Sequence, residues 1–163
     1  MIQLYKRMQR MREKYVDTLA KLYDYATTVY SKKQYTQWYD TKKGGYTYSS
    51  FKGKCDSLSK KLTQYGIGAG DKVAILSQSM PNWSVAFFSV VPFGRIAIPI
   101  LPDSSENEVT NILQHSESKV IFVSQKLMSK LSEECRAKMT LVIDMDTFEV
   151  IQSDEEKFTC DGR

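Results

Sequence analysis

Apolar residues recur at every third or fourth position near the start of the chain. They are Leu4, Met8, Met11, Tyr15, Leu19, Leu22, Ala26 and Val29. On an α-helix this spacing places all of them on one face. The pattern predicts one long helix, or two helices in series, within an amino-terminal helical segment over residues 1–34.

The hydrophobic pattern changes after this segment. Two short aromatic stretches, Tyr35–Asp40 and Tyr46–Tyr48, are separated by two lysines and two glycines, and glycines suit a tight turn, so we predict a β-hairpin. Helical spacing then returns at Phe51, Cys55, Leu58 and Leu62. We expect this helix to begin after Ser49 or Ser50 as its N-cap and to end at Gly66 in a left-handed cap.

From Lys72 onward, strand and helix patterns alternate. The predicted strands are Lys72–Ser77, Ile96–Leu101, Lys119–Ser124 and Thr140–Ile143, and the predicted helices are Pro81–Phe93, Glu106–His115 after the candidate caps Ser104 and Ser105, and Lys126–Arg136. This alternation is typical of parallel strands joined by helical crossovers. The sequence therefore predicts an α/β fold with a parallel sheet over residues 35–150. Beyond Asp144 the apolar period fades, and residues 151–163 are interpreted as an acidic tail.

Composition fits a single domain. The chain has 163 residues, of which 42% are apolar, enough for one substantial core. No apolar run reaches the roughly 18 residues of a membrane span, and basic residues occupy the place of a signal peptide's apolar segment. Cys55, Cys135 and Cys160 are odd in number, lack CxxC spacing and accompany a single histidine. We therefore expect no disulfide framework and no zinc site, and a soluble protein of the reducing cytoplasm.

The positive charge is local. Residues 1–14 carry five basic side chains and one acidic one, which accounts for the whole net charge of +4, so the chain shows no general nucleic-acid footprint. This basic helix favours, at most, peripheral contact of residues 4–30 with an anionic membrane or a partner helix. The basic residues are Lys6, Arg7, Arg10, Arg12 and Lys14.

A glycine-rich stretch, Gly66–Gly70, invites comparison with a dinucleotide loop. Such a loop follows a strand and opens a helix, so that its amides face a pyrophosphate. Here the glycines follow a predicted helix and precede a strand, and no GxxxxGK[ST] loop occurs in the sequence. We interpret the stretch as a helix cap and turn in which Asp71 accepts backbone amides.

Three titratable residues are weak candidates for chemistry. His115 lies near a predicted helix end, where an imidazole can meet terminal carbonyls, which favours a structural or solvated role. Asp144 and Asp146 could form an acid pair or part of a metal site, but they lie in an acidic run, so a solvated loop is expected. The sequence thus offers no catalytic, cofactor-binding or metal-binding residue.

Several stretches, read in order, resemble the opening of the AMP-forming adenylating superfamily, which includes acyl-CoA synthetases, luciferases and peptide-synthetase adenylation domains. The resemblance runs colinearly over about residues 35–125. It is carried by Tyr46–Phe51, Leu58–Leu62, Tyr65–Ile75, Met80–Trp83, Phe87–Pro99, Glu108–Gln114 and Lys119–Phe122.

The chain also departs from the superfamily pattern. Ser77–Ser79 replaces a common asparagine, Asn82 stands where glutamate is usual, and Pro92 should kink a helix that is normally intact. The Ser/Thr/Gly-rich phosphate loop, the ribose-binding aspartate and the carboxy-terminal lysine have no counterpart here. The resemblance therefore implies an amino-terminal fragment whose catalytic residues lie downstream of Arg163.

The resemblance implies a complete enzyme that uses ATP and Mg²⁺ to join AMP to a carboxylic acid and then transfers the acyl group to coenzyme A. A long-chain fatty acid is the favoured substrate, the fragment alone is expected to be inactive, and no cofactor is expected on it. Two alternatives from the residues stay open: a stand-alone α/β interaction module with a basic helix, and a small-ligand-binding module of flavodoxin-like build.

Overall fold

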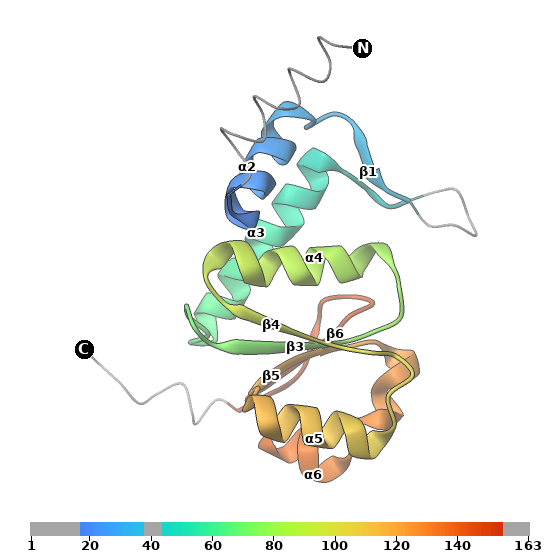
Figure 1. The fold of residues 1–163 in the computed structure, drawn as a ribbon. Helices are drawn as coiled ribbons and strands as arrows, with labels where there is room; N and C mark the ends of the chain where they lie inside the picture. The colour runs from blue at the N-terminus through green and yellow to red at the C-terminus, as the bar shows by residue number, and fades with distance from the viewer. Residues whose placement is uncertain (1–16, 38–43, 155–163) are drawn as a thin grey trace.

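The computed structural model describes residues 17–37 and 44–154, which form three layers (Figure 1). The middle layer is a five-stranded sheet. Helices α3 and α4 cover one face, and α5 and α6 cover the other (Figure 1). The strands are β3 Lys72–Leu76, β4 Ile96–Ile100, β5 Val120–Val123, β6 Leu141–Asp144 and β7 Val150–Ser153.

The sheet has the strand order β4-β3-β5-β6-β7. Strands β3 to β6 pair in parallel, which confirms the predicted α/β fold and its helical crossovers. Strand β7 pairs antiparallel with β6 and was not predicted. The sheet therefore continues to Ser153, and the expected start of the tail at residue 151 falls inside a strand. Residues 155–163 of that tail lie outside the described part.

Helix α4 spans Pro81–Val90, and a 3₁₀ turn, η1, continues over Val91–Phe93. Pro92 was expected to kink this helix, but the α-helix instead ends before it. Proline lacks the amide that would continue the α-helical hydrogen bonds. Helix α5 spans Glu106–Ser116 and begins at Ser105, which forms a capping box with Glu108. The predicted helix Lys126–Arg136 is wrong in extent: a 3₁₀ helix, η2, covers Gln125–Lys130, and a short helix, α6, covers Glu133–Lys138.

Helix α3 spans Tyr48–Gln64. Its N-cap is Thr47 rather than Ser49 or Ser50, and Ser50 completes the capping box from inside the helix. The other end confirms the glycine cap. Gly66 has φ of +73°, and its amide and that of Ile67 bond back to Thr63 and Leu62, as in a Schellman motif.

The predicted hairpin is present as β1 Gln34–Thr36 paired antiparallel with β2 Tyr46–Thr47. Its turn lysines lie outside the described residues. Helix α2 spans Leu19–Val29, and the predicted helix over residues 4–16 also lies outside them.

Helix α2 docks on α3 through Tyr23. The Tyr23 hydroxyl donates to the Asp56 carboxylate at 2.8 Å, and its ring contacts Phe51 and Phe88 at centroid distances of 6.1 and 5.9 Å. Burial and the hydrogen bond to Asp56 raise the pKa of Tyr23, so the hydroxyl stays a donor. A buried aromatic side chain with a paired polar end holds the two helices together.

The core lies on both faces of the sheet because strand side chains alternate. Val73 and Ile75 face α3 and α4, whereas Ala74 and Leu76 face α5 and α6. Strands β5 and β6 alternate in the same way. A continuous run of apolar residues in each strand is what a sheet covered on both faces requires.

Strand β4 forms one edge of the sheet. The amide of Ile96 donates to the Asp71 carbonyl at 2.9 Å, so Ile96, Ile98 and Ile100 direct their backbone groups toward β3. Ala97 and Pro99 therefore direct theirs to the open side, where the proline has no amide to offer.

Arg95 is 5% exposed and was not predicted to be important. Its guanidinium donates to the Ile67 carbonyl at 3.0 and 2.9 Å, to Ser59 Oγ at 2.8 Å and to Thr63 Oγ1 at 2.7 Å. Longer bonds reach the carbonyls of Ser59 and Ser89. Burial lowers the pKa of Arg95, while the charge of Asp71 opposes this shift. The side chain joins the end of α3 to α4 and the start of β4.

We expect Arg95→Met to lower the free energy of unfolding by about 2–4 kcal/mol, because it removes every donor and leaves buried carbonyls unpaired. Urea unfolding followed by circular dichroism measures this. Lys126→Met, at an exposed position, should change the value by less than about 0.5 kcal/mol. An Arg95→Met protein as stable as the parent would show that the network contributes nothing.

Candidate functional site

The carboxyl ends of β3 and β5 mark a topological switch point. The chain leaves β3 through α4 and reaches β4 on one side, whereas it leaves β5 through η2 and α6 and reaches β6 on the other. Ligands of open α/β sheets bind in the crevice where such connections diverge. This edge is therefore the candidate functional site.

Buried polar side chains occupy this edge. Ser124 is fully buried and donates to Gln78 Oε1 at 2.7 Å. Asp144 is 6% exposed; it accepts Gln125 Nε2 at 2.9 Å and the Asp146 amide at 2.6 Å. Asp146 accepts the Gln125 amide at 2.9 Å. The expected solvated position is wrong for Asp144, which is buried and accepts backbone and amide donors that would otherwise be unpaired. Asp146 is exposed, as expected.

Asn82 connects three elements at this edge. It lies in the first turn of α4 and is 6% exposed. Its amide donates to the carbonyls of Met145 and Asp146, both at 2.9 Å, and its oxygen accepts the Tyr46 hydroxyl at 2.5 Å. Burial raises the pKa of Tyr46, which keeps that hydroxyl protonated. Asn82 thereby ties the hairpin and the β6–β7 turn to α4.

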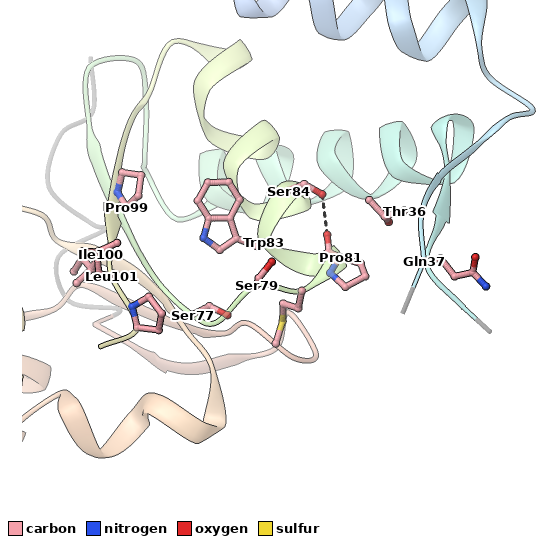
Figure 2. A pocket seen from close by; sticks show the side chains of 12 residues that line it. Thr36, Gln37, Ser77, Ser79, Pro81, Trp83, Ser84, Pro99, Ile100 and Leu101 are labelled. Atoms are coloured by element: carbon pink, nitrogen blue, oxygen red, sulfur yellow. Dashed lines mark hydrogen bonds between the residues drawn. The ribbon is translucent and has the colours of Figure 1, made fainter. Parts of the chain in front are cut away.

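A groove of about 740 Å³ opens beside this polar network, which we call the Trp83 groove (Figure 2). Trp83 lies between the end of β4, with Pro99, Ile100 and Leu101, and the side carrying Thr36 and Gln37 (Figure 2). The Trp83 ring stacks on Phe87 at 5.4 Å. Ser84 donates back to the Pro81 carbonyl at 2.8 Å. An apolar cavity with a few hydroxyls has the general character of a ligand pocket.

The glycine stretch lies at the opposite, amino-terminal edge of the sheet. Asp71 accepts the Gly68 amide at 2.7 Å, and the Gly70 amide donates to the Gly94 carbonyl at 2.8 Å. The interpretation as a cap and turn is confirmed, and these residues do not form a nucleotide loop, because they open no helix.

The remaining candidates are dispersed. His115 is exposed in the last turn of α5, as expected. Cys55 and Cys135 are buried free thiols, and burial raises the pKa of Cys55 to about 12. Among the described residues, no three His, Cys, Asp or Glu side chains gather as a metal site. The basic residues 6–14 and Cys160 lie outside the described part.

The family model described as AMP-binding enzyme matches residues 25–161. The chain belongs to the AMP-binding enzyme family. This confirms the family resemblance and extends it beyond residues 35–125, on which the motifs rested.

Individual relatives support the same family. The 4-hydroxybutyrate--CoA ligase 2 of Metallosphaera sedula is 30% identical over 104 residues, which cover 62% of this chain and 19% of that protein. Long chain acyl-CoA synthetase 2 of Arabidopsis thaliana is 23% identical over 127 residues, covering 74% and 19%. The chain thus spans about a fifth of these relatives.

The fold matches solved members of the AMP-binding enzyme family. The N-terminal domain of FACL13 from Mycobacterium tuberculosis, solved with a bound inhibitor, has a TM-score of 0.70 and 21% identity, covering 89% of this chain and 36% of that one. The chain therefore has the fold of part of such an N-terminal domain. In residues 17–37 and 44–154, none of the helices has the length and apolar character needed to cross a bilayer.

We expect Gly66→Val and Asp71→Ala to lower the midpoint of thermal unfolding. A β-branched side chain at a left-handed position costs roughly 1 kcal/mol or more, and Asp71→Ala leaves the Gly68 amide without its acceptor. Titration of the same proteins with NAD and ATP is the companion measurement. Variants that melt like the parent but lose a nucleotide bound by the parent would show that the turn is a ligand site.

We also expect Asn82→Leu to lower the free energy of unfolding by about 1–3 kcal/mol, because two carbonyls and the Tyr46 hydroxyl lose their partner. Asn107→Leu is a matched control, since Asn107 holds the equivalent position in the first turn of α5 but is exposed. Urea unfolding compares the two. Equal losses in the free energy of unfolding would mean that the hydrogen bonds of Asn82 do not stabilise the fold.

Proposed function

We propose that this chain is the amino-terminal part of an AMP-forming acyl-CoA ligase. The observation that carries the proposal is the family match over residues 25–161. The relatives described above, a CoA ligase and an acyl-CoA synthetase, agree with it. The complete enzyme would use ATP and Mg²⁺ to convert a carboxylic acid to an acyl-adenylate and would then form its CoA thioester.

Adenylation suits this substrate class because a carboxylate is a poor electrophile until one of its oxygens becomes part of a good leaving group. An enzyme accelerates such a step by aligning the acid with the α-phosphate and by placing donors toward the developing charge. The glycine turn does not fit ATP, and the donors of the polar network are already paired within the fold. We therefore assign no step of the reaction to a described residue.

A long-chain fatty acid is the proposed acid. Its support is the likeness to long chain acyl-CoA synthetase 2 and the apolar lining of the Trp83 groove at the carboxyl edge. Peripheral contact of residues 4–30 with an anionic membrane is part of the same proposal, because a fatty acid partitions into lipid and residues 6–14 are basic.

We predict that the 163-residue chain alone neither exchanges pyrophosphate into ATP nor forms acyl-CoA, whereas the whole protein read from its natural gene does both. Exchange of labelled pyrophosphate is measured with butyrate, 4-hydroxybutyrate, octanoate and palmitate. Among these acids, palmitate should give the highest kcat/KM for pyrophosphate exchange. Exchange by the chain alone, or a whole protein that responds to none of these acids, would contradict the proposal.

A further inference from the structure

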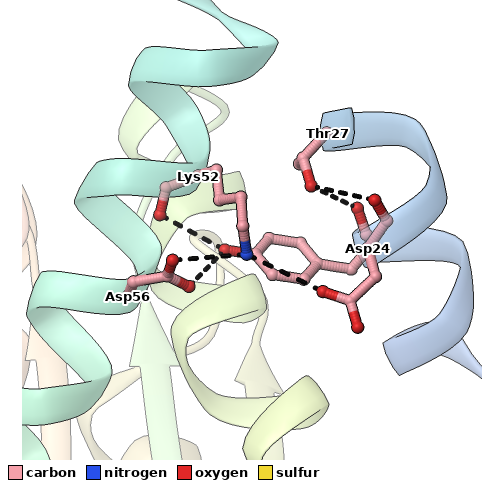
Figure 3. Close-up of polar contacts among 5 residues, drawn as sticks. Asp24, Thr27, Lys52 and Asp56 are labelled. Carbon is pink, nitrogen blue, oxygen red and sulfur yellow. Dashed lines mark hydrogen bonds and ion pairs between the residues drawn. The ribbon is translucent and has the colours of Figure 1, made fainter. Parts of the chain in front are cut away.

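The lysines of α3 lie in two different electrostatic environments. The helix carries Lys52, Lys54, Lys60 and Lys61 but a single acidic residue, Asp56. Lys52 lies between Asp56 and Asp24, with Nζ–O distances of 3.3 and 3.7 Å, and its ammonium is 4.7 Å from the centre of the Tyr23 ring (Figure 3). Its charge is therefore balanced within the fold.

The other three lysines line a cavity of about 450 Å³ between α3 and the β6–β7 turn, which we call the lysine hollow. No acidic side chain lines it, and none of the three lysines forms an ion pair in the described part of the chain. Like charges gathered without a carboxylate repel each other, and an anion relieves that repulsion. Its other polar lining residues are Ser57, Gln64 and Thr147.

The wall opposite α3 is held in an uncommon conformation. Phe148 has φ of +62°, a region that bulky side chains rarely adopt. Its ring packs edge-on against Phe122 at 6.4 Å, and its carbonyl accepts Lys61 Nζ at 3.0 Å. An ammonium has three donors, so Lys61 is fixed at the hollow with two donors left.

The remaining two lysines are also available to a ligand. The Lys54 ammonium lies 5.7 Å from the centre of the Tyr46 ring and makes no hydrogen bond in the described part of the chain. Lys60 is exposed and makes no polar contact there. Lys54 and Lys61 are two helical turns apart on the same face of α3, roughly 10 Å along the axis, so both flexible side chains can reach a ligand with several anionic oxygens in the hollow.

We propose that the lysine hollow binds an anion with two adjacent phosphate groups. Lysine binds phosphate through its ammonium group, which is a compact positive charge. Phosphate oxygens accept hydrogen bonds from several directions, which suits donors on two walls of the hollow. Three lysines without a lining carboxylate favour a polyanion over a single carboxylate. The proposal does not depend on the ligase reaction, and it departs from the sequence-based expectation that no phosphate-bearing cofactor binds this chain alone.

Isothermal titration calorimetry tests the proposal with inorganic pyrophosphate, ADP and adenosine. Pyrophosphate should bind with a dissociation constant of about 1 mM or below at low salt and more weakly at about 0.15 M salt. Lys60→Gln and Lys61→Gln should each weaken binding about three- to tenfold, and the triple variant with Lys54→Gln should abolish it. Adenosine should not bind. ADP binding as tightly as pyrophosphate assigns the site to the diphosphate alone, and tighter ADP binding assigns it to a nucleotide.

Lys52→Gln is the matched control, because it removes the same charge from the same helix outside the hollow. It should leave the affinity within about twofold of the parent, and circular dichroism verifies that every variant is folded. An equal loss in Lys52→Gln and Lys60→Gln would mean general attraction of counter-ions and would overturn the proposal. So would a parent that does not bind pyrophosphate but binds anionic phosphatidylglycerol vesicles.

Discussion

The buried guanidinium of Arg95 is the interaction on which the arrangement of this domain depends. The end of a helix leaves carbonyl groups without partners, and here the carbonyl of Ile67, just beyond the α3 cap, accepts from the side chain of Arg95, the residue before β4. The same group reaches Ser59, Thr63 and the carbonyl of Ser89 in α4. One residue thus sets the position of α3 and α4 relative to the edge of the sheet, and the hydrophobic layer between them packs around that constraint.

The amino and carboxyl ends of the strands are held by different kinds of interaction. The amino-terminal edge is closed by backbone hydrogen bonds among glycines and by Asp71. The carboxyl ends of the strands are held by side-chain hydrogen bonds, of Ser124 with Gln78 and of Asn82 with the β6–β7 turn, and the Trp83 groove lies beside them. A network whose members are all paired resists rearrangement, because any change leaves a buried polar group unsatisfied. The groove is therefore bordered by a rigid wall.

Much of this architecture was predictable from local patterns. The alternation of strand and helix from Lys72 to Ile143 fixed the parallel sheet, and Gly66 fixed the end of α3, because each depends on a short stretch of sequence. Strand β7 was missed because Val150–Ser153 is a short edge strand with no continuous apolar run. The helix N-cap was placed two or three residues late because Thr47, Ser49 and Ser50 all have suitable hydroxyls.

The candidate site was less predictable, since it depends on contacts between distant residues. Arg95 lies 28 residues from Ile67, and Asn82 lies 63 residues from Met145. Local sequence spacing therefore cannot predict either contact. Asn82 did stand out as a departure from the family pattern, and its three contacts suggest why an amide suits this position. Asp144 was interpreted as solvated because acidic composition alone cannot show that a buried carboxylate caps its own turn.

Pro99 at the open edge of β4 limits how this protein can associate. An exposed sheet edge is a template for a strand from a neighbouring molecule, and such pairing leads to aggregates. A second copy approaching β4 finds the amide of Ala97 but none at Pro99, where the ladder would need its next donor. The sheet can still be lengthened by a strand that supplies its own amide to the Pro99 carbonyl. Pro99 thus disfavours addition of a second copy in that register, while the edge stays compatible with a strand of different register and sequence.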